Sequence, residues 1–84
     1  MKHATEETLK GLGPLLKEIR DMDGVAERKF GVFYLGSSAF VHFHESDENV
    51  CGDIKVGSDW ERYPIDTVAQ RRKFVRRVRA VTQK

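Results

Sequence analysis

Between Phe40 and Val56, side chains that can bind a metal ion or take part in catalysis alternate with apolar ones. The segment reads FVHFHESDENVCGDIKV and contains two of the three histidines and the only cysteine of the chain. Imidazole, thiolate and carboxylate groups are the usual ligands of zinc, and a closed structural site needs four of them. The candidate zinc ligands are therefore His42, His44, Cys51 and Asp53.

The same four side chains admit two other interpretations. In a catalytic one, Cys51 is a nucleophile and His44 is its base, but nothing near Cys51 indicates a helix N-terminus or glycine-rich turn that would stabilise an oxyanion. In a structural one, His42 and Asp53 form a cross-strand polar pair worth about 0.2–1 kcal/mol. Ligands on flat neighbouring strands point nearly parallel, which disfavours a tetrahedral centre. The sequence thus favours the structural interpretation over a metal site, and a metal site over catalysis.

A β-hairpin is expected to bring these side chains onto one face of a sheet. Strands over residues 39–45 and 50–56, joined by the polar loop 46–49, pair Glu45 with Val50. Because side chains alternate between faces, the opposite face is wholly apolar, and a slip by one residue would scatter the apolar set over both faces. This register creates three further facing pairs: His44 with Cys51, His42 with Asp53, and Phe40 with Lys55.

The predicted outer face combines the histidines with aromatic rings. Phe40 lies on it by alternation, and Phe33 or its neighbours are expected to join it from the preceding strand. Aromatic rings beside histidines on an uncovered sheet are typical of a shallow ligand surface or a homodimer contact. The predicted binding surface consists of Phe40, His42, His44, Asp53 and Lys55.

One helix and one or two more strands are predicted beside the hairpin. Large apolar residues at three- and four-residue steps indicate an amphipathic helix that begins at Pro14 and ends before Gly24. Residues 5–12 are either a preceding turn of helix or a loosely attached arm. An aromatic, β-branched strand is expected at 30–35, and a short edge strand at 60–63 ends before a proline.

A second amphipathic helix is predicted near the C-terminus. Asp66 or Thr67 caps it, and Gln70 stands at the capping-box position after Thr67. The order of elements is α-β-β-β-(β)-α, in which successive strands form an antiparallel meander. The predicted fold is a two-layer α+β domain over residues 1–84, with two helices packed on one face of the sheet.

Charge is unevenly distributed along the chain. Residues 45–61 contain six acids and one lysine, whereas residues 71–84 contain seven lysines and arginines and no acid. Arginines on one side of the last helix predict, as an alternative function, sequence-independent binding to nucleic acid. The other interpretation is a solvated helix face whose charge the acidic segment compensates. The candidate phosphate contacts are Arg72, Arg76 and Arg79.

The DWERYP segment contains the only tryptophan. We expect Trp60 at the rim of the core with its indole N–H near water, as is common for this residue. The alternative is an aromatic binding edge in which Arg62 clamps an anion.

Length and composition limit the function classes. With 84 residues, 39% of them apolar and 33% charged, the chain fits a soluble globular domain. A domain of this size encloses no deep substrate cavity, which argues against an enzyme. One cysteine allows no intramolecular disulfide, and neither a signal peptide nor a membrane span is recognisable. We therefore expect a cytoplasmic protein that does not contact a membrane.

The span FYLGSSAFVHFHE…GDIKV…DWERYPI…QRR resembles a group of small uncharacterised bacterial proteins. In that group, an F-x-H-F-H-E hairpin is followed by a D-x-K/R strand and a W-E-R-[FY]-P step before an arginine-rich helix. The resemblance covers about residues 30–80 and implies a compact α/β fold. It implies no catalytic assignment.

Together these features predict a non-enzymatic cytoplasmic interaction module. Its aromatic and histidine-bearing sheet face would bind a protein partner or a second copy of the chain. Nucleic-acid binding through the basic helix and zinc binding through the hairpin are the alternatives, and zinc is the only cofactor considered.

Overall fold

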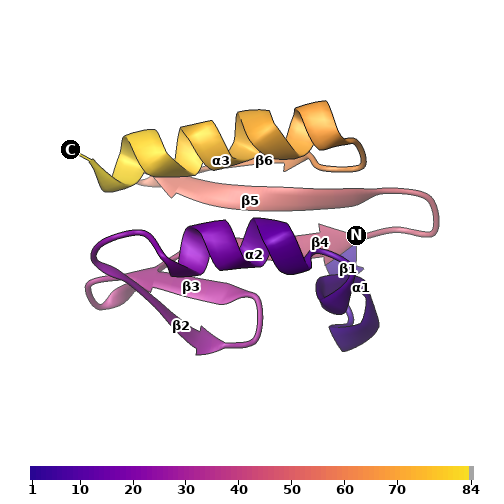
Figure 1. Cartoon of the computed structure of the whole chain (residues 1–84), viewed down its shortest axis with the longest axis horizontal. Coiled ribbons are helices and arrows are strands. Elements are labelled where there is room, and N and C mark those ends of the chain that lie inside the picture. Colours follow the sequence, from indigo (N-terminus) through magenta and orange to yellow (C-terminus); the bar gives the residue numbers. More distant parts are fainter. Residues whose placement is uncertain (84) are drawn as a thin grey trace.

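An antiparallel meander of five strands forms the centre of the fold, and a short N-terminal strand extends it (Figure 1). The computed structural model describes residues 1–83. The strands follow the order β2-β3-β4-β5-β6, and β1 pairs with β4. The elements are β1 (Lys2–His3), α1 (Glu6–Lys10), α2 (Gly13–Arg20), β2 (Val25–Lys29), β3 (Val32–Leu35), β4 (Ser38–Glu45), β5 (Val50–Val56), β6 (Asp59–Pro64) and α3 (Val68–Thr82).

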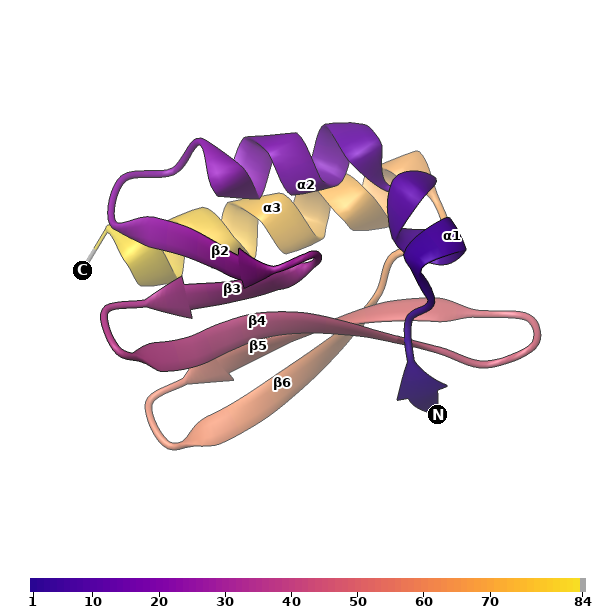
Figure 2. The same cartoon turned by 90° about the horizontal axis from the view of Figure 1, so that it is seen from below.

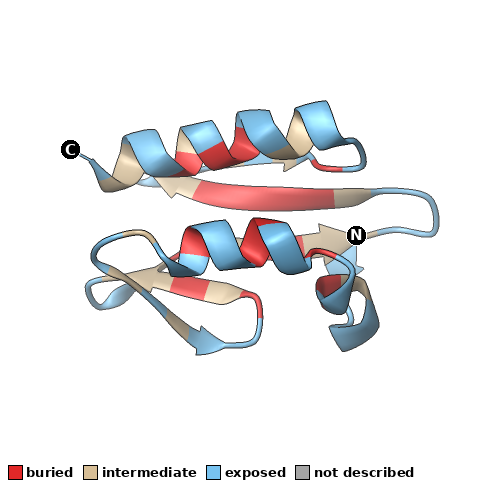
Figure 3. Ribbon diagram, in the orientation of Figure 1, coloured by how far each residue is buried: buried red, intermediate tan, exposed pale blue. Residues whose placement is uncertain are grey.

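Helices α2 and α3 lie side by side on one face of the sheet, which leaves the other face without a helix (Figure 2). Apolar residues at three- and four-residue steps give each helix one buried stripe, and these stripes meet the inner face of the sheet (Figure 3). Gly52 of β5 makes room for the ring of Phe74, since a Cβ atom there would lie 2.6 Å from Phe74 Cζ. The fully buried side chains include Leu16, Ile19, Phe33, Val41, Ile54, Ile65, Phe74 and Val78.

The predicted α+β class, the meander and the placement of helices on one face are confirmed. The hairpin register is confirmed from Glu45 opposite Val50 to Val41 opposite Ile54, but the predicted pair of Phe40 with Lys55 is not among the observed pairs. The C-terminal helix has the predicted capping box: Thr67 Oγ1 accepts from Gln70 N, and Gln70 Oε1 accepts from Thr67 N. The fourth strand of the prediction is β6, which forms one edge of the sheet.

The expected strand at 30–35 is replaced by two strands. Chain reversal at Gly31, which has a φ of 77°, separates β2 from β3, a conformation that glycine adopts without steric cost. The segment VAERK of β2 forms the other edge of the sheet and is mostly exposed, so it has no long apolar run. Glu27 holds the reversal because its carboxylate accepts from Gly31 N at 2.9 Å and from Arg20 Nε.

Of the two alternatives for residues 5–12, a turn of helix or a loosely attached arm, the structure shows the helix. Residues 6–10 form α1, whose Leu9 is buried in the core. Ahead of it, β1 pairs with the end of β4. Hydrogen bonds from Ala4 N to Phe43 O at 3.0 Å and from Thr5 N to Glu45 Oε1 continue this attachment. The fold therefore contains one helix and two strands more than the sequence predicted.

Phe40 lies in the core, whereas the sequence predicted that it would lie on the outer face. The pairing of β3 with β4 runs from Phe33 opposite Val41 to Tyr34 opposite Ala39, so Phe40 is the extra residue of a β-bulge. The bulge breaks the strict alternation of side chains, and Phe40 is only 3% exposed within the core cluster. Phe33 is fully buried there too, so neither phenylalanine contributes to the outer face.

Within residues 1–83, no helix combines the length and the apolar character that a membrane span requires.

Candidate functional site

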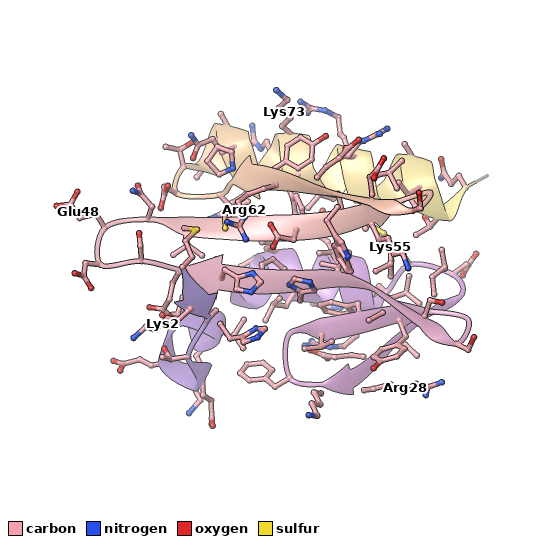
Figure 4. All side chains as sticks on the ribbon, turned by 180° about the vertical axis from the view of Figure 1, so that it is seen from behind. Lys2, Arg28, Glu48, Lys55, Arg62 and Lys73 are labelled. Carbon is pink, nitrogen blue, oxygen red and sulfur yellow. The ribbon has the colours of Figure 1, made fainter. Side chains whose placement is uncertain are left out.

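All three histidines of the chain gather on the face of the sheet that no helix covers. His42 and His44 come from β4, and β1 places His3 directly opposite His44. The ring centroids of His42 and His44 are 4.8 Å apart, and those of His3 and His44 are 4.6 Å apart. We call this surface the histidine face; Figure 4 shows it with Lys55 and Arg62 labelled.

Asp53 of β5 lies between the two histidines of β4. Its Oδ2 atom is 2.9 Å from His44 Nδ1 and 3.8 Å from His42 Nδ1. Both Nδ1 atoms are buried, yet within the described part of the chain neither makes a hydrogen bond. The 2.9 Å contact is short enough for one but lacks the required angle. Two imidazole nitrogens thus converge on one carboxylate oxygen without being satisfied by it.

Arg62 of β6 holds the carboxylate from the other side. Its Nε donates to Asp53 Oδ1 at 2.8 Å and its Nη2 donates to Oδ2 at 3.0 Å, a two-pronged arrangement that orients the carboxylate. Burial opposes ionisation of Asp53, but the hydrogen bonds and charge of Arg62 outweigh it and lower the pKa of Asp53. Asp53 is therefore an anion at neutral pH although only 4% of it is exposed.

His42 is held in its neutral form. Burial lowers the pKa of His42, and the nearby Asp53 carboxylate offsets this only in part. A neutral imidazole has a free nitrogen lone pair, which is the form that binds metal ions. Because burial affects the pKa of His42 more than the Asp53 charge does, the ring is suited to bind a metal ion and not to carry a positive charge.

Trp60 covers His42 from the edge strand. Their ring centroids are 4.4 Å apart with an interplanar angle of 48°, and Trp60 remains 46% exposed. Trp60 therefore lies on the histidine face, whereas the sequence predicted that it would lie at the rim of the core. The reason is register: Trp60 pairs with Lys55 and Arg62 with Asp53, which puts both β6 side chains on the outer side.

Cys51 lies near the histidine face but outside the converging group. Its Sγ is 3.4 Å from Met1 Sδ, and the ligand atoms that lie within 4.8 Å of one another belong to His42, His44 and Asp53 alone among the residues described. Burial raises the pKa of the Cys51 thiol. The thiol form is a poor nucleophile and a poor metal ligand, so the predicted four-residue set is reduced to three residues.

The distances from Asp53 Oδ2 to the two imidazole nitrogens are close to the ligand spacing of a tetrahedral ion. Zinc lies about 2.0–2.2 Å from nitrogen and oxygen ligands, which places two ligands of one ion about 3.4 Å apart. The observed 2.9 Å and 3.8 Å separations lie on either side of this value, so shifts of less than about 0.5 Å would bring both nitrogens into range. The sequence indicated that flat strands disfavour a tetrahedral centre; in the structure, the Nδ1 atoms of both rings nevertheless turn toward Asp53 on the neighbouring strand.

The basic helix is remote from this site. Arg72, Arg76 and Arg79 are exposed on α3, which packs on the inner face of the sheet. None of them forms an ion pair within residues 1–83. The acidic segment compensates the positive charge of α3 at the neighbouring Arg77, which donates two hydrogen bonds to Glu61 at 3.1 and 3.2 Å.

Of the predicted binding surface, all members except Phe40 lie on the histidine face: His42, His44, Asp53 and Lys55. His3 was not predicted at all, and Trp60 and Arg62 were considered only as a separate, alternative binding edge. The alternation of side chains in DWERY would have placed Trp60 and Arg62 on the histidine face, if the strand pairing had been extended from β5 across the turn at Gly57 to β6. No sequence signal indicates that His3, in a two-residue strand, pairs with His44.

Comparison with protein-family models, with curated proteins and with solved structures found no match for this chain. The resemblance to small bacterial proteins therefore stays a prediction, and function has to be argued from the geometry of the histidine face.

Proposed function

We propose that this chain is a non-enzymatic binding module that holds one divalent transition-metal ion on its histidine face. The protein ligands are His42 Nδ1, His44 Nδ1 and Asp53 Oδ2. The observation that carries the proposal is the convergence of two buried, unbonded imidazole nitrogens on one ionised carboxylate.

The two unsatisfied nitrogens carry an energetic cost in the metal-free protein. A buried polar atom without a hydrogen bond costs about 1–3 kcal/mol, and buried polar atoms are therefore nearly always paired. Two such atoms lie side by side here. A cation between them and Asp53 would satisfy both nitrogens at once, on a carboxylate oxygen that also accepts from Arg62 Nη2.

The ligand types favour zinc and its neighbours over magnesium or calcium. Imidazole suits zinc, copper and nickel, whereas magnesium and calcium require sites built from oxygen. Asp53 also remains bonded to Arg62, which fixes its orientation as outer partners do in metal sites. We expect the module to work in a reducing cytoplasm, where the single buried Cys51 stays a thiol.

Zinc binding can be measured by calorimetry, with elemental analysis of the purified protein as a first step. We expect one ion per chain. Outer partners of a metal site are worth about 10–100-fold in affinity, so loss of a direct ligand in His42→Gln or His44→Gln should cost more than about 100-fold. Cys51→Ser is the matched control, because Cys51 is buried nearby but lies outside the converging group. Unchanged zinc binding in both histidine variants, or loss confined to Cys51→Ser, would overturn the proposal.

Trp60 provides an independent readout, because it is the only tryptophan and its ring centroid lies 4.4 Å from that of His42. Paramagnetic copper or nickel bound at His42 should quench its fluorescence, and zinc added in excess should restore it. Quenching of equal size in His42→Gln would show that the ions bind elsewhere.

A second candidate is self-association through the same face. Trp60 is 46% exposed on a sheet surface without a covering helix, and aromatic residues of this kind are enriched in interfaces. Light scattering across protein concentrations, with Trp60→Ser as the variant, tests it. A monomer at every concentration ends this candidate and leaves the metal proposal intact.

Nucleic-acid binding is a third candidate, favoured by the exposed arginines Arg72, Arg76 and Arg79. Titration with short single-stranded DNA and RNA at two salt concentrations tests it, because phosphate contacts weaken steeply as salt rises. Absence of binding at low salt would end this candidate.

A further inference from the structure

We propose that His3 is the fourth ligand of the metal ion and that the ion clamps β1 onto β4. This inference rests on the proposed function, and it adds a residue from a distant part of the sequence. It also changes the character of the site, from three ligands with an open position to a closed set of four.

Strand pairing positions His3 for this role. His3 faces His44 across the β1–β4 pair, and directly opposed Cβ atoms in antiparallel strands lie about 4.5–5.5 Å apart. The His3 ring centroid is 4.6 Å from that of His44 and 6.2 Å from that of His42. Both imidazoles therefore project from the same patch of sheet toward the same side.

The His3 ring is free to complete the site. Its nitrogens lie outside the group of ligand atoms within 4.8 Å of one another, so the ring has to turn about its side-chain bonds. His3 is exposed and its side chain makes no hydrogen bond within residues 1–83, so the rotation has to rearrange only its ring contacts with His42 and His44. Rotation toward His42 and Asp53 would exchange a solvated nitrogen for a metal bond.

The clamp follows from how weakly β1 is attached. Strand β1 has two residues. The hydrogen bonds from Ala4 N to Phe43 O and from Thr5 N to Glu45 extend its pairing, and ahead of it Met1 Sδ lies 3.4 Å from both Cys51 Sγ and Arg62 Nη1. Short terminal pairings of this kind fray readily. A metal ion held by His3 together with His42, His44 and Asp53 would join β1, β4 and β5 and so suppress the fraying.

A closed set of four ligands also indicates what the bound ion does. Catalytic zinc keeps one position for water or substrate, whereas structural zinc is surrounded by four protein ligands. With His3 in place, the ion would fix the N-terminal strand and would present no open position for chemistry. This agrees with a module that binds or is stabilised by the metal and catalyses no reaction.

The test compares His3→Gln with Lys2→Gln, its neighbour in the same strand, in a competition assay against a chromogenic zinc chelator. We expect wild-type and Lys2→Gln affinities within about threefold of each other, and a loss of at least about tenfold in His3→Gln, the scale on which even outer partners of metal sites act. Equal affinity of His3→Gln and wild-type protein would overturn the assignment of His3, while the loss in His42→Gln would still support the three-ligand site.

Hydrogen exchange at the Ala4 amide reports the clamp separately. Zinc should slow exchange of this amide in the wild-type protein and in Lys2→Gln, and should leave it unchanged in His3→Gln. Slowing of equal size in His3→Gln would show that the strand is ordered without His3 as a ligand, which would overturn the inference. If the wild-type protein bound no zinc at all, the inference and the proposed function would both be wrong.

Discussion

The two faces of the sheet are built from the same strands but differ in how completely their atoms are satisfied. On the inner face, Val41 and Ile54 pair with each other and are fully buried among apolar neighbours. One position along each strand, on the outer face, His42 and Asp53 also pair, yet His42 Nδ1 and the nearby His44 Nδ1 are buried without hydrogen bonds. The inner face explains why the chain folds. Folding does not explain the two buried nitrogens without hydrogen bonds on the outer face.

The unsatisfied atoms of the outer face are costly relative to the stability of a whole domain. Domains are stable by only about 5–15 kcal/mol, so two unsatisfied buried nitrogens at about 1–3 kcal/mol each are a large fraction of the total. Deviations from consistent packing and bonding tend to occur at functional sites. The difference between the faces supports the proposed metal site on the outer face, and it can be tested by substituting residues on each side.

The largest loss of stability is expected from Ile54→Ala. Ile54 is fully buried on the inner face, and truncation of such residues to alanine costs about 2–5 kcal/mol in unfolding free energy. Urea denaturation with and without zinc measures the loss, which should be similar in both conditions. A loss below about 1 kcal/mol would contradict the account of the inner face.

A somewhat smaller loss is expected from Gly52→Ala. The new Cβ atom would lie 2.6 Å from Cζ and 2.9 Å from both Cε atoms of Phe74, so the ring has to move within a closely packed core. Overpacking of this kind costs about 1–3 kcal/mol. Thermal unfolding measures the change, and a stabilised variant would show that the space between β5 and α3 is less tightly filled than described.

The outer face predicts a pH dependence that the inner face cannot produce. Burial lowers the pKa of His42, so the unfolded chain takes up this proton more readily than the folded protein. Without metal, stability should be level above about pH 6.5 and should fall as the pH drops below that value. The pKa of Asp53 is lowered as well, so its contribution is present above about pH 3.9 and is lost on further acidification.

Denaturation of the metal-free protein at a series of pH values checks this order of events, with His42→Gln as the comparison. That variant should lose the part of the decrease that begins near pH 6.5 and keep the part that Asp53 causes. An identical pH profile for both proteins would contradict the buried, neutral state of His42.

The smallest effect is expected on the far side of the molecule. Arg76 is exposed on α3 and forms no ion pair within residues 1–83. Arg76→Gln should therefore change the unfolding free energy by no more than about 0.5 kcal/mol and should leave zinc affinity unchanged. A marked decrease in zinc binding would show that the two faces are coupled in a way that the structure does not explain.

The sequence predicts the hairpin well because its physical signals are local. Alternation over residues 41–45 and 50–56 allows one register only, and the pairing of His42 with Asp53 follows from it. The capping box at Thr67 and Gln70 is equally local. Four-residue loops and capping residues can be found within a few positions of the elements they define.

Other features depend on contacts that no short pattern encodes. The bulge that turns Phe40 into the core is set by how β3 meets β4, and β2 has no alternating pattern because it is an exposed edge. His3 reaches the site through pairing with residues about forty positions away. Whether Nδ1 or Nε2 of each histidine points at Asp53 depends on ring rotation, which the sequence does not specify.

Ring orientation also gives the most direct test of the central claim. Long-range ¹H–¹⁵N spectra of the histidine rings, recorded during a zinc titration, distinguish metal bound at Nδ1 from metal bound at Nε2. We predict that Nδ1 of both His42 and His44 shifts to the metal-bound position at one equivalent of zinc, while each Nε2 keeps its proton. Unchanged ring nitrogens, or binding through Nε2, would contradict the proposal that the buried Nδ1 atoms and Asp53 form the metal site.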